Sequence, residues 1–283
     1  MIIFESKVLI AEDFSAVGRL SMSAAVATFA AFGIQTAAVP TELLSTQTEG
    51  FGKPATLQLT DWLPTAFAHW RQIDDLTISS AVIGYIGQTK ACRQLQTELA
   101  HLSLRHILVD PVMGDRGKMY AGFDAGYLNA IKQLVKIATV ITPNAFELGL
   151  LSGIPLTDQS VDEQLIAAIK KCETSARVIV TGIKRDGGIG SCFLAGGKLI
   201  WISSPLIPGH FYGTGDLFAA LLCGYLNFEM NFEAAVKRAV FGTYEAVART
   251  SHASKDQWKY GLDLTKTLYD VSRFTLGQKR EEV

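Results

Sequence analysis

A glycine turn followed by an aspartate is the strongest candidate for chemistry in this sequence. The turn consists of Gly213, Thr214, Gly215 and Asp216, and the apolar run LFAALLCGYL after it predicts a buried helix that begins at or near Gly215. Glycines let the backbone turn tightly against a ligand, and the free N–H groups at a helix N-terminus bind anions. A carboxylate beside them can accept the proton of an attacking hydroxyl group in phosphoryl transfer. Asp216 is therefore a candidate base, while the motif taken alone is equally compatible with a structural turn.

Two further acids follow the predicted strand His106–Val109. They are Asp110 and Asp115 of the run DPVMGD. In a parallel sheet, ligands lie beyond the carboxyl ends of the strands, and two carboxylates there can hold Mg²⁺ directly or through water. The alternative interpretation is an Asp-Pro turn with a solvated aspartate.

Polar residues also follow two other predicted strands. Asn144 and Glu147, in the run TPNAFE, are three residues apart and share a helix face. They suit contacts with metal-bound water and phosphate, or they cap the helix as a reciprocal pair. Thr181 and Gly182 end the run VIVTG, where they either contact a nucleotide phosphate or form a plain turn. Because all four motifs close an apolar strand or open a helix, one shared edge of a sheet would explain them together.

The sequence does not match the other common nucleotide-binding motifs. It contains no Walker loop of the form GxxxxGK[ST], and Phe218 occupies the third glycine position of a GxGxxG pattern. A Rossmann dinucleotide site is therefore disfavoured.

Short apolar runs alternate with longer amphipathic segments along the chain. The predicted strands are Lys7–Ala11, Ile34–Val39, Leu76–Ile83, His106–Val109, Ala138–Ile141 and Arg177–Thr181, and the predicted helices are Ser21–Phe32, Thr89–Leu102, Asp124–Lys136, Ala145–Ser152 and Asp162–Cys172. This alternation, with strands apolar on both faces, indicates a mostly parallel sheet covered by helices on both sides. Ile189–Leu194 and Lys198–Ile202 predict an antiparallel hairpin near one edge, and the chain is mainly helical from Thr214 onward. Residues 1–283 are predicted to form one domain, in which the irregular Thr41–Leu59 is either a binding loop or a surface excursion.

The composition indicates a folded protein of the cytoplasm. Of its 283 residues, 48% are hydrophobic and 19% are charged, and the net charge of −1 gives no field to attract nucleic acid or an acidic membrane. The N-terminus lacks the features of a signal peptide, and no apolar stretch approaches the ~20 residues that span a bilayer. The four cysteines lack metal-ligand spacing and are expected to be buried thiols.

The runs DPVMGDRGKMY, ITPNAFELGLLSG, VIVTG and GTGDLFAALL, in this order, resemble those of pyridoxal kinases of the ribokinase-like superfamily. The similarity extends over nearly the whole chain. It implies a three-layer α/β/α ribokinase-like fold and transfer of the γ-phosphate of ATP to the 5′-hydroxyl group of pyridoxal, pyridoxamine or pyridoxine. It also implies Mg²⁺, a monovalent cation such as K⁺, and a homodimer.

The resemblance assigns a role to each candidate residue. Asp216 would be the base, and the N–H groups of Gly213, Thr214 and Gly215 would form the anion hole. Contacts with ATP are implied for Asp115, Tyr120, Asn144, Glu147, Thr181 and Gly182, and contacts with the metal for Asp110, Asp115 and Glu147. Contacts with the alcohol are implied for Asp13, Gln47, Thr48 and Tyr85.

Two positions depart from the family pattern. Gln47 stands where relatives commonly carry histidine, and Asp13 stands where many carry serine. An acid at position 13 is expected to favour a substrate that bears an amine or is protonated. The main alternative function is a hydroxymethylpyrimidine kinase, although such relatives often carry GTGC in place of GTGD. A non-catalytic binder of vitamin or nucleotide is a second alternative, which the retention of Asp216, Asn144 and Glu147 argues against.

Overall fold

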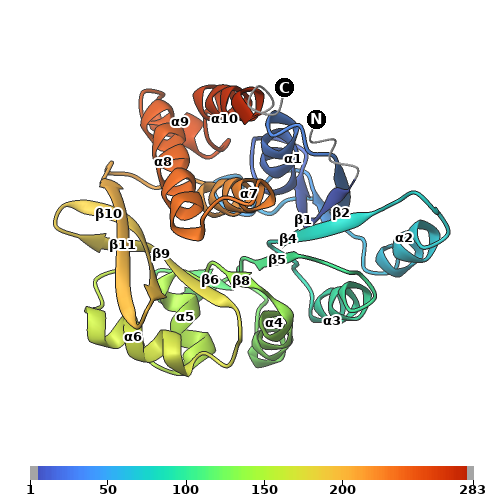
Figure 1. Cartoon of the computed structure of the whole chain (residues 1–283), viewed down its shortest axis with the longest axis horizontal. Helices are drawn as coiled ribbons and strands as arrows, with labels where there is room; N and C mark the ends of the chain where they lie inside the picture. The colour runs from blue at the N-terminus through green and yellow to red at the C-terminus, as the bar shows by residue number, and fades with distance from the viewer. Residues whose placement is uncertain (1–5, 279–283) are drawn as a thin grey trace.

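The structure, a computed structural model, describes residues 6–278 and contains a nine-stranded sheet between two layers of helices (Figure 1). The strand order is β11-β10-β9-β8-β5-β4-β1-β2-β3. The strands are β1 (Lys7–Ser15), β2 (Thr36–Leu44), β3 (Thr56–Gln58), β4 (Ile78–Ile83), β5 (His106–Val109), β8 (Val140–Ile141), β9 (Arg177–Arg185), β10 (Gly188–Ala195) and β11 (Lys198–Pro205). The helices are α1 (Ser21–Ala31), α2 (Leu63–Trp70), α3 (Thr89–Leu99), α4 (Ala125–Ile137), α5 (Ala145–Ser152), α6 (Asp162–Lys171), α7 (Thr214–Asn227), α8 (Phe232–Thr250), α9 (Lys255–Trp258) and α10 (Thr265–Gln278).

Each face of the sheet packs against its own group of helices. Figure 1 shows α1, α7, α8 and α10 on one face and α2 to α6 on the other. Successive side chains of β1 therefore enter different cores: Val8 and Ile10 pack with residues of α1 and α7, whereas Leu9 and Ala11 pack with residues of α3 and α4. This burial on both faces explains why the strands are continuously apolar in sequence.

The predicted three-layer arrangement with a mostly parallel sheet is confirmed. The six central strands, in the sheet order β9-β8-β5-β4-β1-β2, run parallel to their neighbours. At one edge β3 pairs antiparallel with β2, and at the other β10 pairs antiparallel with both β9 and β11. The predicted hairpin is present, with Ala195 opposite Lys198 and positive φ angles of 55° and 79° at Gly196 and Gly197. Two residues with positive φ are typical of the tight turns that join antiparallel strands.

Three features differ from the sequence-based prediction, besides the length of β9. The irregular segment is shorter than Thr41–Leu59, because β2 continues to Leu44 and pairs with β3, which leaves residues 45–55 as the loop. Helix α2 was not predicted. A small second hairpin, formed by β6 (Gly114–Asp115) and β7 (Lys118–Met119), was also missed because each strand has only two residues.

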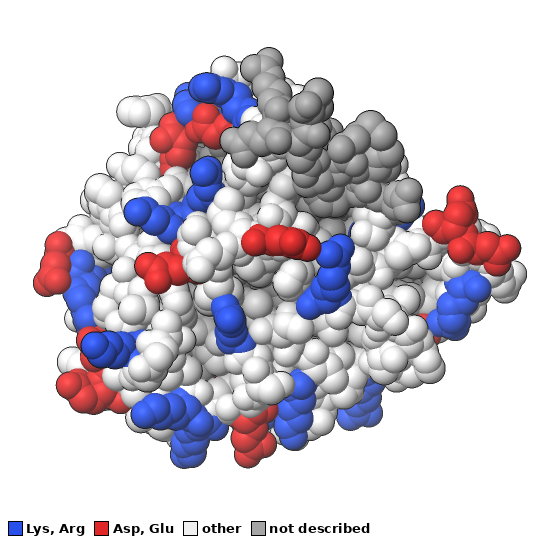
Figure 2. All heavy atoms as spheres, in the orientation of Figure 1, with Lys and Arg blue, Asp and Glu red and all other residues white. Residues whose placement is uncertain are grey.

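No helix within residues 6–278 is long and apolar enough to cross a membrane. On the face drawn in Figure 2, basic and acidic side chains are scattered among one another.

Candidate active site

The glycine turn forms the N-terminus of α7, as the sequence predicted. Gly213 is the N-cap with a φ of 83°, a left-handed conformation that favours glycine, and its carbonyl accepts the first helical bond from the Leu217 N–H at 3.1 Å. The first N–H groups of a helix have no partner within it. The turn therefore presents backbone donors and the positive end of the α7 dipole at one edge of the sheet.

Asp216 is held in the first turn of α7 by a residue from the start of α1. The Ser21 N–H donates to Oδ2 of Asp216 at 2.7 Å, and Ser21 itself has a positive φ of 42°. Burial raises the pKa of Asp216, and the hydrogen bonds from Ser21 partly oppose that rise. A carboxylate whose pKa is raised toward neutrality is a better proton acceptor when ionised.

Asp110 lies directly against the glycine turn. A Cβ atom on Gly215 would lie 3.0 Å from Oδ2 of Asp110, so glycine is the residue that leaves room for this carboxyl. Asp110 is 8% exposed. Its pKa is raised well above its usual range, first by burial and then by the charges of Glu147 and Asp216. The carboxyl end of β5 and the N-terminus of α7 thus meet, as expected from a shared sheet edge.

Glu12 is a buried acid at this site that the sequence analysis missed. It is 1% exposed and its Oε1 atom has no hydrogen-bond partner among the described residues. Burial raises its pKa well above the usual range, and the charges of Asp216, Asp13 and Asp110 add to the effect. The sequence did hold a signal for it: Glu12 directly follows the apolar run VLIA inside β1, and an acid in a buried strand is costly without a function.

Asp13, the predicted substrate contact, is also buried. It is 5% exposed, and the Ser15 hydroxyl donates to its Oδ2 atom at 3.2 Å. Burial raises its pKa from 3.8 to about 7, and the nearby charge of Asp216 contributes to the rise. Asp13 and Asp216 therefore share one electrostatic environment, although they are far apart in sequence.

Asn144 and Glu147 form the reciprocal helix cap that was one of the two predicted interpretations. Asn144 Oδ1 accepts from the Glu147 N–H, and Glu147 Oε2 accepts from the Asn144 N–H, each at 2.9 Å. Glu147 Oε1 accepts from the Met113 N–H at 3.0 Å, which ties the DPVMGD loop to α5. Burial raises the pKa of Glu147 to about 7. Because three backbone donors surround Glu147 within 3.5 Å, its first role in this structure is to fix two loops of the site.

The strand that carries Thr181 does not end there, contrary to the prediction. β9 continues to Arg185, and Thr181 and Gly182 together face a single residue of β10, since Val180 pairs with Cys192 and Ile183 with Gly190. The positive φ of 70° at Gly182 accommodates this β-bulge. The Thr181 N–H donates to the Pro143 carbonyl at 2.9 Å, so the bulge lies beside the TPN run.

The remaining predicted residues lie in the loops around the turn. Tyr85 and Tyr120 are half-buried and both contact the ring of Phe123, with centroids 5.6 Å and 6.5 Å from it. Thr48 is exposed in the 45–55 loop. The Gln47 amide donates to the Lys259 carbonyl at 2.7 Å, so this side chain fastens the loop to the segment after α9.

The three predicted metal residues do not converge on one point. Within residues 6–278, no group of three acidic, histidine or cysteine side chains is arranged to hold a metal ion. Asp115 is exposed and its Oδ1 accepts from the Arg116 N–H at 2.7 Å. Even so, hard oxygen donors at Asp110 and Asp115 suit Mg²⁺, which usually takes one or two carboxylates and completes its shell with water and phosphate.

Comparison with known proteins shows the family to which this chain belongs. A sequence model of the family described as phosphomethylpyrimidine kinase matches residues 21–260. A pyridoxal kinase of Arabidopsis thaliana is 31% identical over 224 residues, which cover 74% of this chain and 69% of the relative. The chain belongs to the pyridoxal kinase family of the ribokinase-like superfamily.

Solved structures of similar kinases share the fold. The crystal structure of pyridoxal kinase from Lactobacillus plantarum is 36% identical, with a TM-score of 0.89 over 95% of this chain and 97% of that one. A putative phosphomethylpyrimidine kinase from Bacteroides thetaiotaomicron, crystallised with pyridoxal, is 27% identical, with a TM-score of 0.85 over 94% and 96% of the two chains. Two fission-yeast relatives described as putative pyridoxal kinases are aligned over only 47% and 35% of their own lengths.

Proposed function

We propose that this protein transfers the γ-phosphate of ATP to the 5′-hydroxyl group of pyridoxal, pyridoxamine or pyridoxine. The observation that carries the proposal is the position of Asp216 in the first turn of α7, beside the backbone donors of the glycine turn. A base and an anion site on one helix end are what in-line phosphoryl transfer to an alcohol requires. Membership of the pyridoxal kinase family supports the choice of alcohol.

In this mechanism, Asp216 accepts the proton of the hydroxyl group as the alcohol attacks. The N–H donors of Gly213, Thr214 and Gly215 hold the transferring group and stabilise the charge that develops on it. The Ser21 N–H, 2.7 Å from Asp216 Oδ2, fixes the carboxylate while it takes up the proton. Asp13, Thr48 and Tyr85 are the proposed contacts to the ring of the alcohol.

A cation would resolve the electrostatic conflict at the turn. The Asp110 carboxyl faces Gly215, and an ionised carboxylate there would repel a bound phosphate. Asp110 and Asp115 are the side chains that would hold Mg²⁺, partly through water, with the Glu147 cap positioning both loops. When bound, Mg²⁺ neutralises phosphate charge. The proposal includes K⁺ as a second cation, and contacts with the nucleotide from Tyr120, Asn144, Thr181 and Gly182.

The experiment that tests the proposal is an ATP-dependent kinase assay with the three B6 vitamers and hydroxymethylpyrimidine, in Mg²⁺ with and without K⁺. We expect turnover of at least one vitamer and a loss of about 10²–10⁴ in kcat for the Asp216→Asn variant. Full activity of that variant would contradict the assignment of the base. No turnover of any vitamer would contradict the function.

Hydroxymethylpyrimidine kinase is the second candidate, because the matching family model carries the phosphomethylpyrimidine kinase description. The same assay separates the two candidates: a higher kcat/KM for the pyrimidine alcohol would replace the first proposal. A homodimer, a single domain over residues 1–283 and a cytoplasmic location also belong to the proposal. Light scattering of the purified protein tests the dimer.

A further inference from the structure

One histidine bridges the three segments that surround the glycine turn. His210 precedes Gly213 by three residues, and its ring contacts two side chains of opposite charge. Its Nδ1 atom is 2.6 Å from Nη2 of Arg116, and its Nε2 atom is 3.2 Å from Oε2 of Glu49. Arg116 lies in the tight turn between β6 and β7, and Glu49 lies in the 45–55 loop.

The chemistry of the two partners fixes the proton on the His210 ring. A guanidinium group can only donate hydrogen bonds, so Nδ1 must accept from Arg116. A carboxylate can only accept, so Nε2 must carry the proton and donate to Glu49. The ring is therefore a neutral imidazole in one defined tautomer, with an acceptor on one side and a donor on the other.

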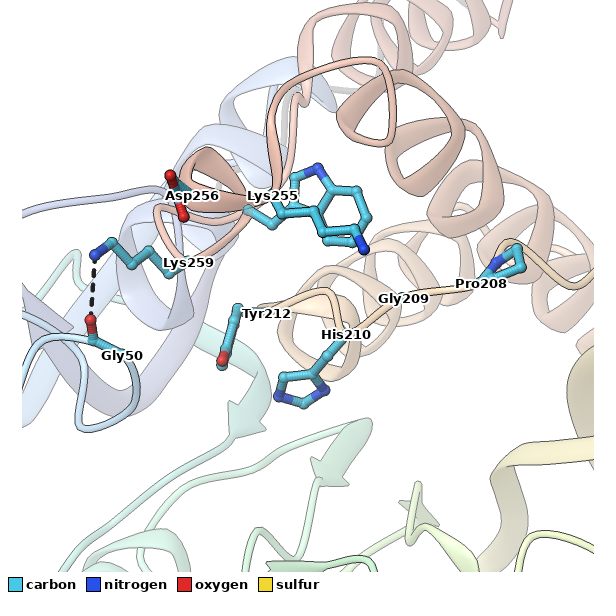
Figure 3. Close-up of a pocket in the computed structure, with 9 residues that line it drawn as sticks. Gly50, Pro208, Gly209, His210, Tyr212, Lys255, Asp256 and Lys259 are labelled. Atoms are coloured by element: carbon cyan, nitrogen blue, oxygen red, sulfur yellow. Dashed lines mark hydrogen bonds between the residues drawn. The ribbon is translucent and has the colours of Figure 1, made fainter.

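The backbone that carries His210 is anchored independently of this bridge. Phe211 packs on Trp258 with ring centroids 4.4 Å apart, and a Cβ atom on Gly209 would lie 2.5 Å from the same indole. Figure 3 shows His210 and Tyr212 on this segment beside the pocket, which has a volume of about 540 Å³. Because contacts with α9 hold the main chain in place, the imidazole is not needed for that purpose and can connect the side chains of Glu49 and Arg116.

The 45–55 loop is likewise held by the segment after α9, where Lys259 is its main partner. The Lys259 ammonium donates to the Gly50 carbonyl at 3.2 Å, drawn as a dashed line in Figure 3, and lies 4.5 Å from the centre of the Phe51 ring. These contacts hold the loop to the segment after α9 but do not reach the β6–β7 hairpin. Within the part of the chain that the structure describes, His210 provides the side-chain link from the loop to the hairpin.

We propose that His210 is a positioning residue for phosphoryl transfer: as a neutral donor–acceptor bridge between Glu49 and Arg116, it holds the 45–55 loop and the β6–β7 hairpin together over the glycine turn. The loop carries Thr48 and the hairpin carries Asp115, whose side chain lies 3.7 Å from Nε of Arg116. The bridge therefore joins the loop that is proposed to contact the alcohol to the hairpin that is proposed to hold Mg²⁺. This inference rests on the kinase function proposed above and names a residue outside the predicted site.

The test compares three substitutions that keep or remove the two hydrogen-bonding roles. His210→Gln keeps one acceptor and one donor, His210→Ala keeps neither, and His210→Lys keeps only donors. Because the partners are partly exposed, we expect a moderate effect: a rise in KM for the alcohol of about three- to tenfold in the Ala and Lys variants, with kcat changed less. The Gln variant should remain within about twofold of the wild type. His69→Ala, on the exposed side of α2, is the matched control and should have no effect.

Hydrogen exchange provides a second measurement that does not depend on turnover. The backbone amides of residues 45–55 should exchange faster in the His210→Ala and His210→Lys variants than in the wild type and the Gln variant. Unchanged exchange and unchanged KM would overturn the inference, as would a Gln variant that behaves like Ala. If the wild type turns over no alcohol, the kinase proposal fails by itself, and the exchange rates still decide whether the bridge exists.

Discussion

The buried Asp13 carboxyl predicts that an Asp13→Asn variant is more stable than the wild type at pH 8. Its pKa is raised from 3.8 to about 7 in the folded protein, mainly by burial. Between these two values the folded state keeps a proton that the unfolded chain releases, so the free energy of unfolding of the wild type falls as the pH rises. At about 1.4 kcal/mol per pKa unit, the total loss is about 4 kcal/mol. About 3 kcal/mol of that loss falls between pH 5 and pH 8.

Urea unfolding at pH 5 and pH 8, without ligands or divalent cations, measures this difference. Asparagine stays neutral and can still accept the hydrogen bond that Ser15 donates to Asp13. The stability gain of Asp13→Asn over the wild type should therefore grow by about 3 kcal/mol from pH 5 to pH 8. Asp75→Asn, which changes an exposed acid between α2 and β4, is the control and should show no such growth. An equal effect of Asp13→Asn at both pH values would refute the reasoning.

Two further substitutions test how the site is packed. Gly84→Ala places a Cβ atom 2.5 Å from Oε2 of Glu12, and we expect a loss of about 1–3 kcal/mol of stability in thermal unfolding; an unchanged Tm would show that Glu12 can move aside. Glu147→Ala removes the acceptor of buried backbone N–H groups in two loops, and we expect a loss of about 2–4 kcal/mol. Glu163→Ala, at an exposed position of α6, is its control, and equal stability of the two variants would contradict the role of Glu147 in fixing the loops.

Much of the fold could be predicted because its signals are local. Continuous apolar strands, amphipathic helices and the Gly196–Gly197 turn each leave a periodic or compositional pattern. Helix α2 (Leu63–Trp70) was missed although Pro64 stands in its first turn, a position where proline is favoured. The β6–β7 hairpin is too short to produce any alternation, so only the pairing of Gly114 with Met119 reveals it.

The residues of the candidate site could be predicted where they belong to a motif at the end of a strand or the start of a helix. They could not be predicted where their position depends on a contact with a residue far away in sequence. Asp110 and Asp216 follow directly from motifs at the sheet edge. Glu12 follows an apolar run, but its closeness to Asp110 and Asp216, which come from two distant segments, is visible only in the assembled structure. The contact from Gln47 to the Lys259 carbonyl joins residues 212 positions apart, and no sequence pattern encodes it.

The late position of α7 has a consequence for the synthesis of the protein on the ribosome. Every residue from Leu217 to Leu226 is buried, and Gly224 lies so close to the Phe32 ring that a Cβ atom there would be 2.1 Å from it. Until the ribosome has released this helix, one face of the sheet and the inner side of α1 stay uncovered. The nascent chain therefore exposes a large apolar surface for most of its translation, the condition in which chaperones bind and aggregation begins. The segment that delivers Asp216 is the same one that ends this exposure, so a chain truncated before α7 would be both inactive and prone to aggregate.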